Sequence, residues 1–219
     1  MNHDVPSGAP SLGYAPAYSE FDIHQGLAWI ASEAEWIGLR LVEENTQQRK
    51  VRNQRPEQNS FGLRRGIMVE ALVDGQIAYA GTSDLSELGL RDAARRAVGL
   101  AQASAPFKVF ENSSRQRPAN RGRYCSPRRQ ELDALSLTEF TSKLITASRH
   151  LQVSDKIVNA VAEAALVDSR CQYVSTNGAD IDQRFLLVSC NFAVTANDGT
   201  ETQSRSLNGP VANCRQAGL

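Results

Sequence analysis

Alternation of apolar and polar positions predicts β-strands over much of this chain. It is strictest in residues 186–196, where every second residue is apolar, as in a half-buried strand. Three dipeptides typical of two-residue turns separate strand-like stretches: Asp74-Gly75, Asn177-Gly178 and Asp198-Gly199. Such turns need positive φ, which Asp, Asn and Gly tolerate better than other residues. The sequence therefore predicts three β-hairpins.

Three other segments repeat apolar residues at helical spacing. In residues 23–34 the apolar side chains share one helix face, and Ser19 is the predicted N-cap. A second helix, rich in Ala and Leu, follows the first hairpin over residues 85–103 and starts after a Ser-Asp pair. The third begins at Ser136, which is spaced from Glu139 as in a capping box.

Weaker patterns lie between these elements. Residues 36–44 alternate as a strand does, and the polar residues 46–53 are predicted to be its antiparallel partner. Pro and Gly within residues 55–62 predict a loop. Residues 157–168 fit a helix by their Ala content and a strand by their alternation, so both assignments stay open.

Hairpins with packed helices predict an α+β fold, with antiparallel sheets in two sub-domains. A segment rich in Pro, Gly, Ser and Ala, residues 1–19, is predicted to be a disordered leader. An amino-terminal α+β domain then covers residues 20–110. Residues 111–130 are predicted to be an Arg-rich linker, and residues 131–219 a second α+β segment that leads towards a catalytic domain absent from the sequence.

Composition narrows the function classes. Lys+Arg and Asp+Glu number 24 each, so no overall field favours a polyanionic partner. No apolar run approaches the roughly 18 residues of a membrane span, and no signal peptide is present, so we expect a cytoplasmic protein. The four cysteines lack C-x-x-C spacing and are expected to be reduced thiols: Cys125, Cys171, Cys190 and Cys214.

Motifs for catalysis are missing from the sequence. The three histidines, His3, His24 and His150, include no pair within one helical turn, and none is followed by Glu. Neither a G-x-S-x-G elbow nor a glycine-rich nucleotide-binding motif occurs. We therefore assign no catalytic and no metal-binding residue, and we expect no cofactor in this chain.

Two segments remain as candidates for binding. Residues 112–129 contain six arginines and no acid, which could contact phosphates, but Tyr124 is the one aromatic residue there and the net charge of the chain is zero. A solvated linker is the preferred interpretation. The strand predicted over residues 200–206 is polar on both faces, as expected of a solvated edge or a wet cavity wall. Its candidate substrate-cavity residues are Thr200, Thr202, Ser204, Arg205 and Ser206.

The ordered set of segments from Glu20 to Leu219 resembles the amino-terminal region of the TldD/PmbA (TldE) family of metallopeptidases. The matching segments are Trp36-Ile37-Gly38-Leu39-Arg40 with Glu43-Glu44, Gly66 to Gly75, Ala78 to Leu85, Tyr173 to Asp180, and Asp198-Gly199 before Gln203-Ser204-Arg205-Ser206. The resemblance implies homo- or heterodimers that enclose a chamber and act on small or unfolded peptides. It also implies a zinc site in a His-Glu-x-x-x-His helix, which would lie beyond these residues in the full-length enzyme.

Three hypotheses follow. The first is the non-catalytic amino-terminal portion of a TldD/PmbA-like zinc metallopeptidase, which supplies dimer contacts and substrate-cavity wall. The second is an inactive PmbA/TldE-like partner subunit that works as an interaction protein, and the TldD-like and TldE-like branches both stay open. The third and least favoured is an Arg-rich nucleic-acid-binding module.

Overall fold

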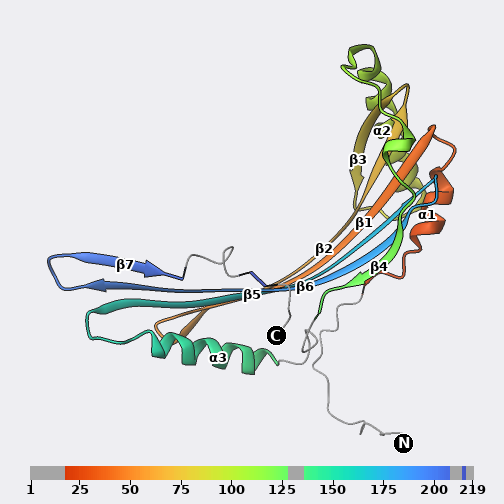
Figure 1. Ribbon diagram of the computed structural model, residues 1–219. Coiled ribbons are helices and arrows are strands. Elements are labelled where there is room, and N and C mark those ends of the chain that lie inside the picture. The colour runs from red at the N-terminus through yellow and green to blue at the C-terminus, as the bar shows by residue number, and fades with distance from the viewer. Residues whose placement is uncertain (1–17, 128–135, 208–213, 216–219) are drawn as a thin grey trace, which may run out of the picture.

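The described residues of the computed structural model, 18–127, 136–207 and 214–215, form one seven-stranded sheet with three α-helices (Figure 1). The strands are β1 (Trp36–Arg52), β2 (Arg55–Val73), β3 (Gln76–Thr82), β4 (Arg121–Cys125), β5 (Ile157–Ser175), β6 (Asp180–Asn197) and β7 (Thr202–Ser206). The helices are α1 (Ile23–Ile30), α2 (Glu87–Ser104) and α3 (Leu137–His150), with 3₁₀ turns at Ala105–Phe107 and Ser114–Gln116. The predicted α+β class is confirmed.

The strand order is β3-β2-β1-β5-β6-β4, and β7 also pairs with β6. Every pairing is antiparallel except that of β4 with β6, which is parallel. All three predicted hairpins are present, at the β2–β3, β5–β6 and β6–β7 connections. Asp74-Gly75 is a two-residue turn, whereas residues 176–179 and 198–201 form longer loops. The ambiguous residues 157–168 belong to β5, because their alternation matches burial on one face of the sheet.

The polar stretches after residue 45 were assigned wrongly. Residues 46–53 are not a separate partner strand, because β1 continues to Arg52, and residues 55–62 are strand rather than loop. The turn is Asn53-Gln54, where both residues have positive φ, 47° and 64°, without a glycine. Pro56 is tolerated because β3 pairs only with residues 67–73 and leaves this part of β2 at the sheet edge.

Side-chain caps fix where the helices begin. Asp22, not Ser19, caps α1: its Oδ1 accepts hydrogen bonds from the backbone N–H groups of residues 24 and 25. Ser19 instead donates its backbone N–H to Glu43 Oε1 at 2.7 Å. The predicted capping box of Ser136 and Glu139 is confirmed at the start of α3.

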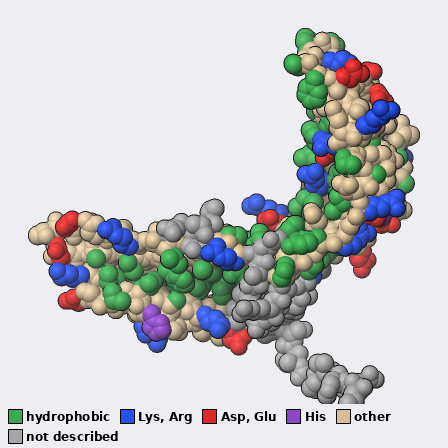
Figure 2. Space-filling view, viewed as in Figure 1, with side chains coloured by type: hydrophobic (Ala, Val, Ile, Leu, Met, Phe, Trp, Pro, Cys, Tyr) green, Lys and Arg blue, Asp and Glu red, His purple; other side chains and the backbone are tan. Residues whose placement is uncertain are grey.

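Two apolar clusters lie on the same face of the sheet, one at each end. Helices α1 and α2 pack on the first, around Leu39, Val69 and Leu90, and α3 packs on the second, around Val51 and Leu166. The long strands bend between the clusters, so that the molecule has two arms with α1 and α3 on the convex side (Figures 1 and 2). The concave face carries no α-helix among the described residues, and we call it the open face.

Two predicted segments look different in the structure. Residues 111–130 are not simply a linker, because Arg121–Cys125 form β4 at the edge of the sheet. Their polar composition gave no strand signal, and the pairing with β6 comes from tertiary contacts. The predicted leader, residues 1–19, lies outside the described residues except for Tyr18 and Ser19.

Candidate functional site

The candidate cavity residues 200–206 lie at the tip of the arm that carries α3 (Figure 1). Thr200 belongs to the turn, Thr202–Ser206 form β7, and all of these residues are exposed. Asp198 Oδ1 accepts hydrogen bonds from the backbone N–H groups of Thr200 and Glu201 and thereby fixes the turn. The predicted strand is present but begins at Thr202, and its contact with a substrate stays a prediction.

The hydrogen-bond register shows which groups of β7 are available. Leu207 N–H donates to Phe192 O, and Asp198 N–H donates to Glu201 O. Antiparallel partners alternate between bonded and non-bonded pairs, so the bonded positions of β7 are residues 203 and 205. The backbone groups of Thr202, Ser204 and Ser206 therefore point away from β6. Among the described residues no strand pairs with this outer edge.

The predicted Arg-rich linker is tied to the sheet by its arginines. Arg117 Nη2 donates to Tyr79 Oη at 2.9 Å, and Arg121 Nε donates to Gly178 O at 2.9 Å. Arg123 forms an ion pair with Asp180, at 2.7 Å between Nη1 and Oδ1. Of the other three arginines, Arg115 is exposed, while 128 and 129 lie outside the described residues. These bonds oppose the nucleic-acid interpretation.

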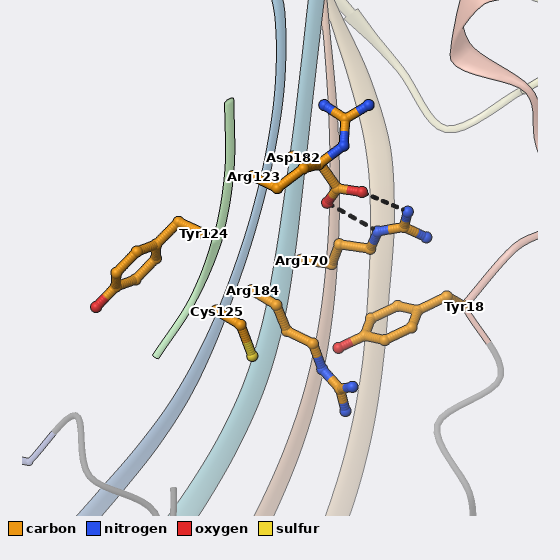
Figure 3. A pocket seen from close by; sticks show the side chains of 7 residues that line it. All are labelled: Tyr18, Arg123, Tyr124, Cys125, Arg170, Asp182 and Arg184. Atoms are coloured by element: carbon orange, nitrogen blue, oxygen red, sulfur yellow. Dashed lines mark hydrogen bonds and ion pairs between the residues drawn. The ribbon is translucent and has the colours of Figure 1, made fainter. Parts of the chain in front are cut away.

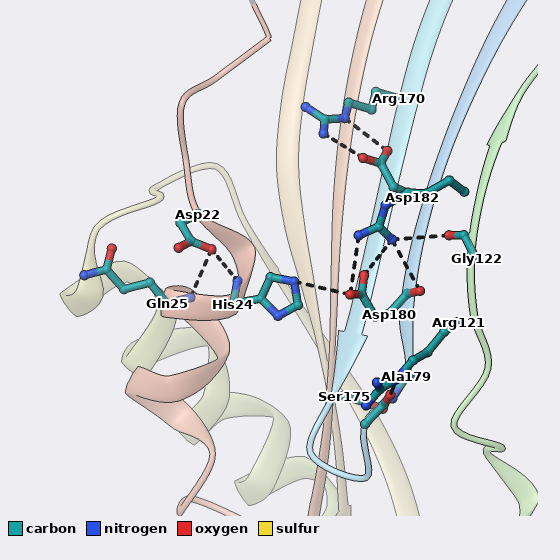
Figure 4. Close-up of polar contacts among 12 residues, drawn as sticks. Asp22, His24, Gln25, Arg121, Gly122, Arg170, Ser175, Ala179, Asp180 and Asp182 are labelled. Carbon is teal, nitrogen blue, oxygen red and sulfur yellow. Dashed lines mark hydrogen bonds and ion pairs between the residues drawn. The ribbon is translucent and has the colours of Figure 1, made fainter.

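Asp180 connects three elements at the edge of the sheet (Figure 4). Besides Arg123 of β4, it meets His24 of α1, whose Nε2 lies 3.7 Å from Oδ2. The hydrogen bond from Arg123 is the largest cause that lowers the pKa of Asp180. His24 is therefore a surface contact of α1, and His150, at the end of α3, is exposed. His3 lies outside the described residues.

A pocket of about 480 Å³ lies beside Tyr18, a residue that the sequence did not single out (Figure 3). The Tyr18 ring is close to the guanidinium groups of Arg170 and Arg184, whose Cζ atoms are 5.5 and 5.2 Å from its centroid. Its hydroxyl donates to Asp168 Oδ1 at 2.6 Å, and burial is the largest cause that raises the pKa of Tyr18. In the sequence, a single tyrosine before a helix does not indicate that its ring will lie beside two arginines.

Buried polar side chains separate the two apolar clusters on the helix-bearing face. Glu43, Asn45, Gln47 and Arg49 alternate along β1 and are each less than 9% exposed. Asp168 lies across from Asn45 on β5 and is fully buried, where Arg184 bonds it through Nε and Nη2 at 2.9 and 2.5 Å. We call these five residues the polar belt. The sequence did not indicate their burial, because periodicity cannot show what covers a face.

The four cysteines lie at different depths in the structure. All four are free thiols, with Cys125 and Cys214 exposed and Cys171 and Cys190 half-buried. Burial is the largest cause that raises the pKa of Cys171, which disfavours its thiolate. Cys190 packs against the second apolar cluster. Within the described ranges, no group of three or more His, Cys, Asp or Glu side chains could hold a metal ion.

Residues 38–101 match the model of the PmbA/TldA metallopeptidase domain 1. This segment is a first domain of the TldD/PmbA type. A search of curated proteins gives no match. No helix in the described part of the chain is long and apolar enough to cross a membrane. The match covers most of β1, the hairpin β2–β3 and most of α2. It includes the quoted segments Gly66 to Gly75 and Ala78 to Leu85, whereas Tyr173 to Asp180 and the segments after it lie outside the match.

Three solved structures have a similar fold over most of the chain. A proposed modulator of a DNA gyrase from Thermotoga maritima aligns at TM-score 0.62 and 14% identity, over 84% of this chain and 41% of that one. TldE from Thermococcus kodakarensis aligns at TM-score 0.62 and 11% identity, over 89% of this chain and 43% of that one. A proposed modulator of DNA gyrase from Bacteroides thetaiotaomicron aligns at TM-score 0.60 and 11% identity, over 84% of this chain and 42% of that one. The chain thus spans about two fifths of the length of these structures.

Proposed function

We propose that this chain is the amino-terminal, non-catalytic portion of a TldD/PmbA-like zinc metallopeptidase that acts on small or unfolded peptides in the cytoplasm. The first-domain match and the fold shared with two fifths of longer proteins support this role. The described side chains do not fit a zinc ion, because they bring no three ligands together. Zinc would be held by other residues of the full-length enzyme, and this portion would supply subunit contacts and cavity wall.

The outer edge of β7 is the observation that carries the cavity role. A peptide in extended conformation can add to an exposed strand through main-chain hydrogen bonds, without a fixed side-chain sequence. Thr202, Ser204 and Ser206 direct their backbone groups to that edge, and their side chains are small and polar. Such an edge suits peptides that differ in sequence, which is the substrate class proposed.

Replacement of Ser204 by proline tests the edge in the full-length protein. Proline removes the outward N–H but leaves the bonded positions 203 and 205 intact. Ser204→Ala is the matched control, because it loses only the hydroxyl contact with Thr195, at 3.0 Å, and keeps the N–H. We expect Ser204→Pro to weaken peptide binding, measured by calorimetry, and Ser204→Ala to bind as the parent does. Equal binding by both variants would refute the role of β7.

An inactive partner subunit is the second candidate, because one of the similar folds belongs to TldE. In that case the protein would work through a dimer with a zinc-bearing family member. Co-expression of the full-length protein with such a subunit, followed by light scattering and zinc analysis, distinguishes the two. One zinc per heterodimer favours the partner role, whereas a homodimer that binds zinc and cleaves peptides favours the enzyme.

A further inference from the structure

The open face of the sheet carries a charged cluster that the proposed function does not use. Arg40 Nη2 lies 3.4 Å from Glu70 Oε1, and Arg117 Nη2 lies 3.8 Å from Glu70 Oε2. The Glu70 side chain is 4% exposed, whereas those of Arg40 and Arg117 are 49% and 39% exposed. Two guanidinium cations therefore share one buried carboxylate, which leaves one positive charge uncompensated within the cluster.

A pocket of about 460 Å³ opens beside these two arginines. The amide side chains of Gln116, Asn120 and Gln183 line it, and none of its lining residues is Asp or Glu. Its walls come from β1, β5 and β6 and from the segment that enters β4. The pocket thus offers hydrogen-bond donors and a positive charge, which is the chemistry of an anion site.

Neighbouring aromatic residues hold the arginines in place. The Arg40 guanidinium lies over the Tyr173 ring, with Cζ 5.6 Å from the centroid, and Arg117 donates to Tyr79. Gly38 makes room for Tyr173, because a Cβ at that position would lie 2.7 Å from the tyrosine hydroxyl. Burial first, and then the Glu70 carboxylate, raises the pKa of Tyr173 to about 12, so its ring stays uncharged at neutral pH.

We propose that Arg40 and Arg117 bind a carboxylate, supplied by the C-terminus of a peptide. Glu70 Oε2 accepts no hydrogen bond although it is buried, so Arg117 is close to Glu70 without a direct bond to that oxygen. The planar donors of arginine suit a carboxylate better than a spherical anion. The carboxylate site follows from the cluster itself, whereas the peptide as its source rests on the proposed function.

Titration calorimetry of this chain with tri-alanine, tri-alanine amide and acetate tests the site. We expect tri-alanine to bind, and the amide to bind roughly tenfold more weakly or worse, because it lacks the charge that the arginines recognise. Arg40→Gln and Arg117→Gln should weaken tri-alanine binding to a similar degree. Arg115→Gln is the matched control, because Arg115 is exposed in the same segment and lies outside the pocket.

Glu70→Gln separates recognition from folding. It removes the internal competitor for the arginines, so tri-alanine should bind more tightly, whereas a merely structural role predicts weaker binding. Arg117→Lys keeps the charge and should retain part of the affinity that Arg117→Gln loses. Equal binding of tri-alanine and its amide, or equal affinity of Arg117→Gln and Arg115→Gln, would overturn the site. Acetate binding as tight as that of tri-alanine would refute the peptide source, and none of these results depends on β7.

Discussion

The substitution Asp168→Asn tests whether the polar belt stabilises the bend between the two arms. Asp168 is fully buried in β5 and accepts hydrogen bonds from Arg184 Nε and Nη2 and from the Tyr18 hydroxyl. Asparagine has nearly the same shape but carries no charge. The substitution therefore removes the Asp168 charge that faces the Arg184 guanidinium and replaces one acceptor oxygen by an N–H donor.

The expected loss of stability in Asp168→Asn follows from the burial of the Asp168 side chain. Removal of one partner of a fully buried pair typically costs 3–5 kcal/mol, and Arg184 is 29% exposed, so water compensates part of its charge. We expect the free energy of unfolding to fall by about 3 kcal/mol. For a chain of this length that corresponds to a decrease in Tm of about 6–12 °C.

Urea denaturation followed by circular dichroism measures this loss. Asp180→Asn is the control, because its partner Arg123 is 61% exposed and such pairs contribute at most about 1 kcal/mol. Asp168→Asn combined with Arg184→Gln should lose less stability than the sum of the single variants predicts, since the two side chains belong to the same pair. The Asp168–Arg184 pair does not stabilise the fold as expected if Asp168→Asn costs no more than Asp180→Asn, or if the double variant is less stable than the sum of the single variants predicts.

Two further predictions concern the open face. Gly38→Ala should lower the free energy of unfolding by about 1–3 kcal/mol, because its Cβ would meet the Tyr173 hydroxyl at 2.7 Å and the Trp36 ring at 2.9 Å. Gly62→Ala, with nothing within 4 Å, should be neutral or stabilising in the same denaturation assay. The second prediction uses pH: the pKa of Tyr173 is raised from 10.0 to about 12, so the unfolded chain loses this proton first. The contribution of the uncharged Tyr173 side chain to the free energy of unfolding is present in full below pH 10 and falls between pH 10 and 12. Tyr173→Phe should therefore make the loss of stability at alkaline pH shallower.

Turn and cap chemistry made the hairpins and helices predictable. Asp74 and Gly75 both have positive φ, 49° and 74°, as the two-residue turn requires. The Ser136 capping box lies where the sequence placed it. These signals are local, so they need no knowledge of the rest of the fold. Ser19 shows their limit, because its N–H bonds Glu43 in a distant strand and Asp22 takes the cap instead.

Features that depend on distant partners were missed. Asn53-Gln54 forms a two-residue turn without glycine, held by bonds to β5 such as Asn53 N–H to Ala160 O at 2.9 Å. Tyr18 gains its role only when β5 and β6 bring two arginines around its ring. Along β1 the apolar alternation changes to a polar one at residue 43 without a change in burial. No sequence period separates a buried polar face from a solvated one.

The arginines after α2 connect the fold to the inferred site. Arg121 and Arg123 bond Gly178 and Asp180, so their charges fix β4 at the edge of the sheet. Arg117 precedes them in the same segment but reaches the open face, where Glu70 already faces Arg40. A polyanion would need these charges together on one accessible surface. The structure separates them, and the positive charge left beside the pocket of Arg40 and Arg117 suits a single carboxylate.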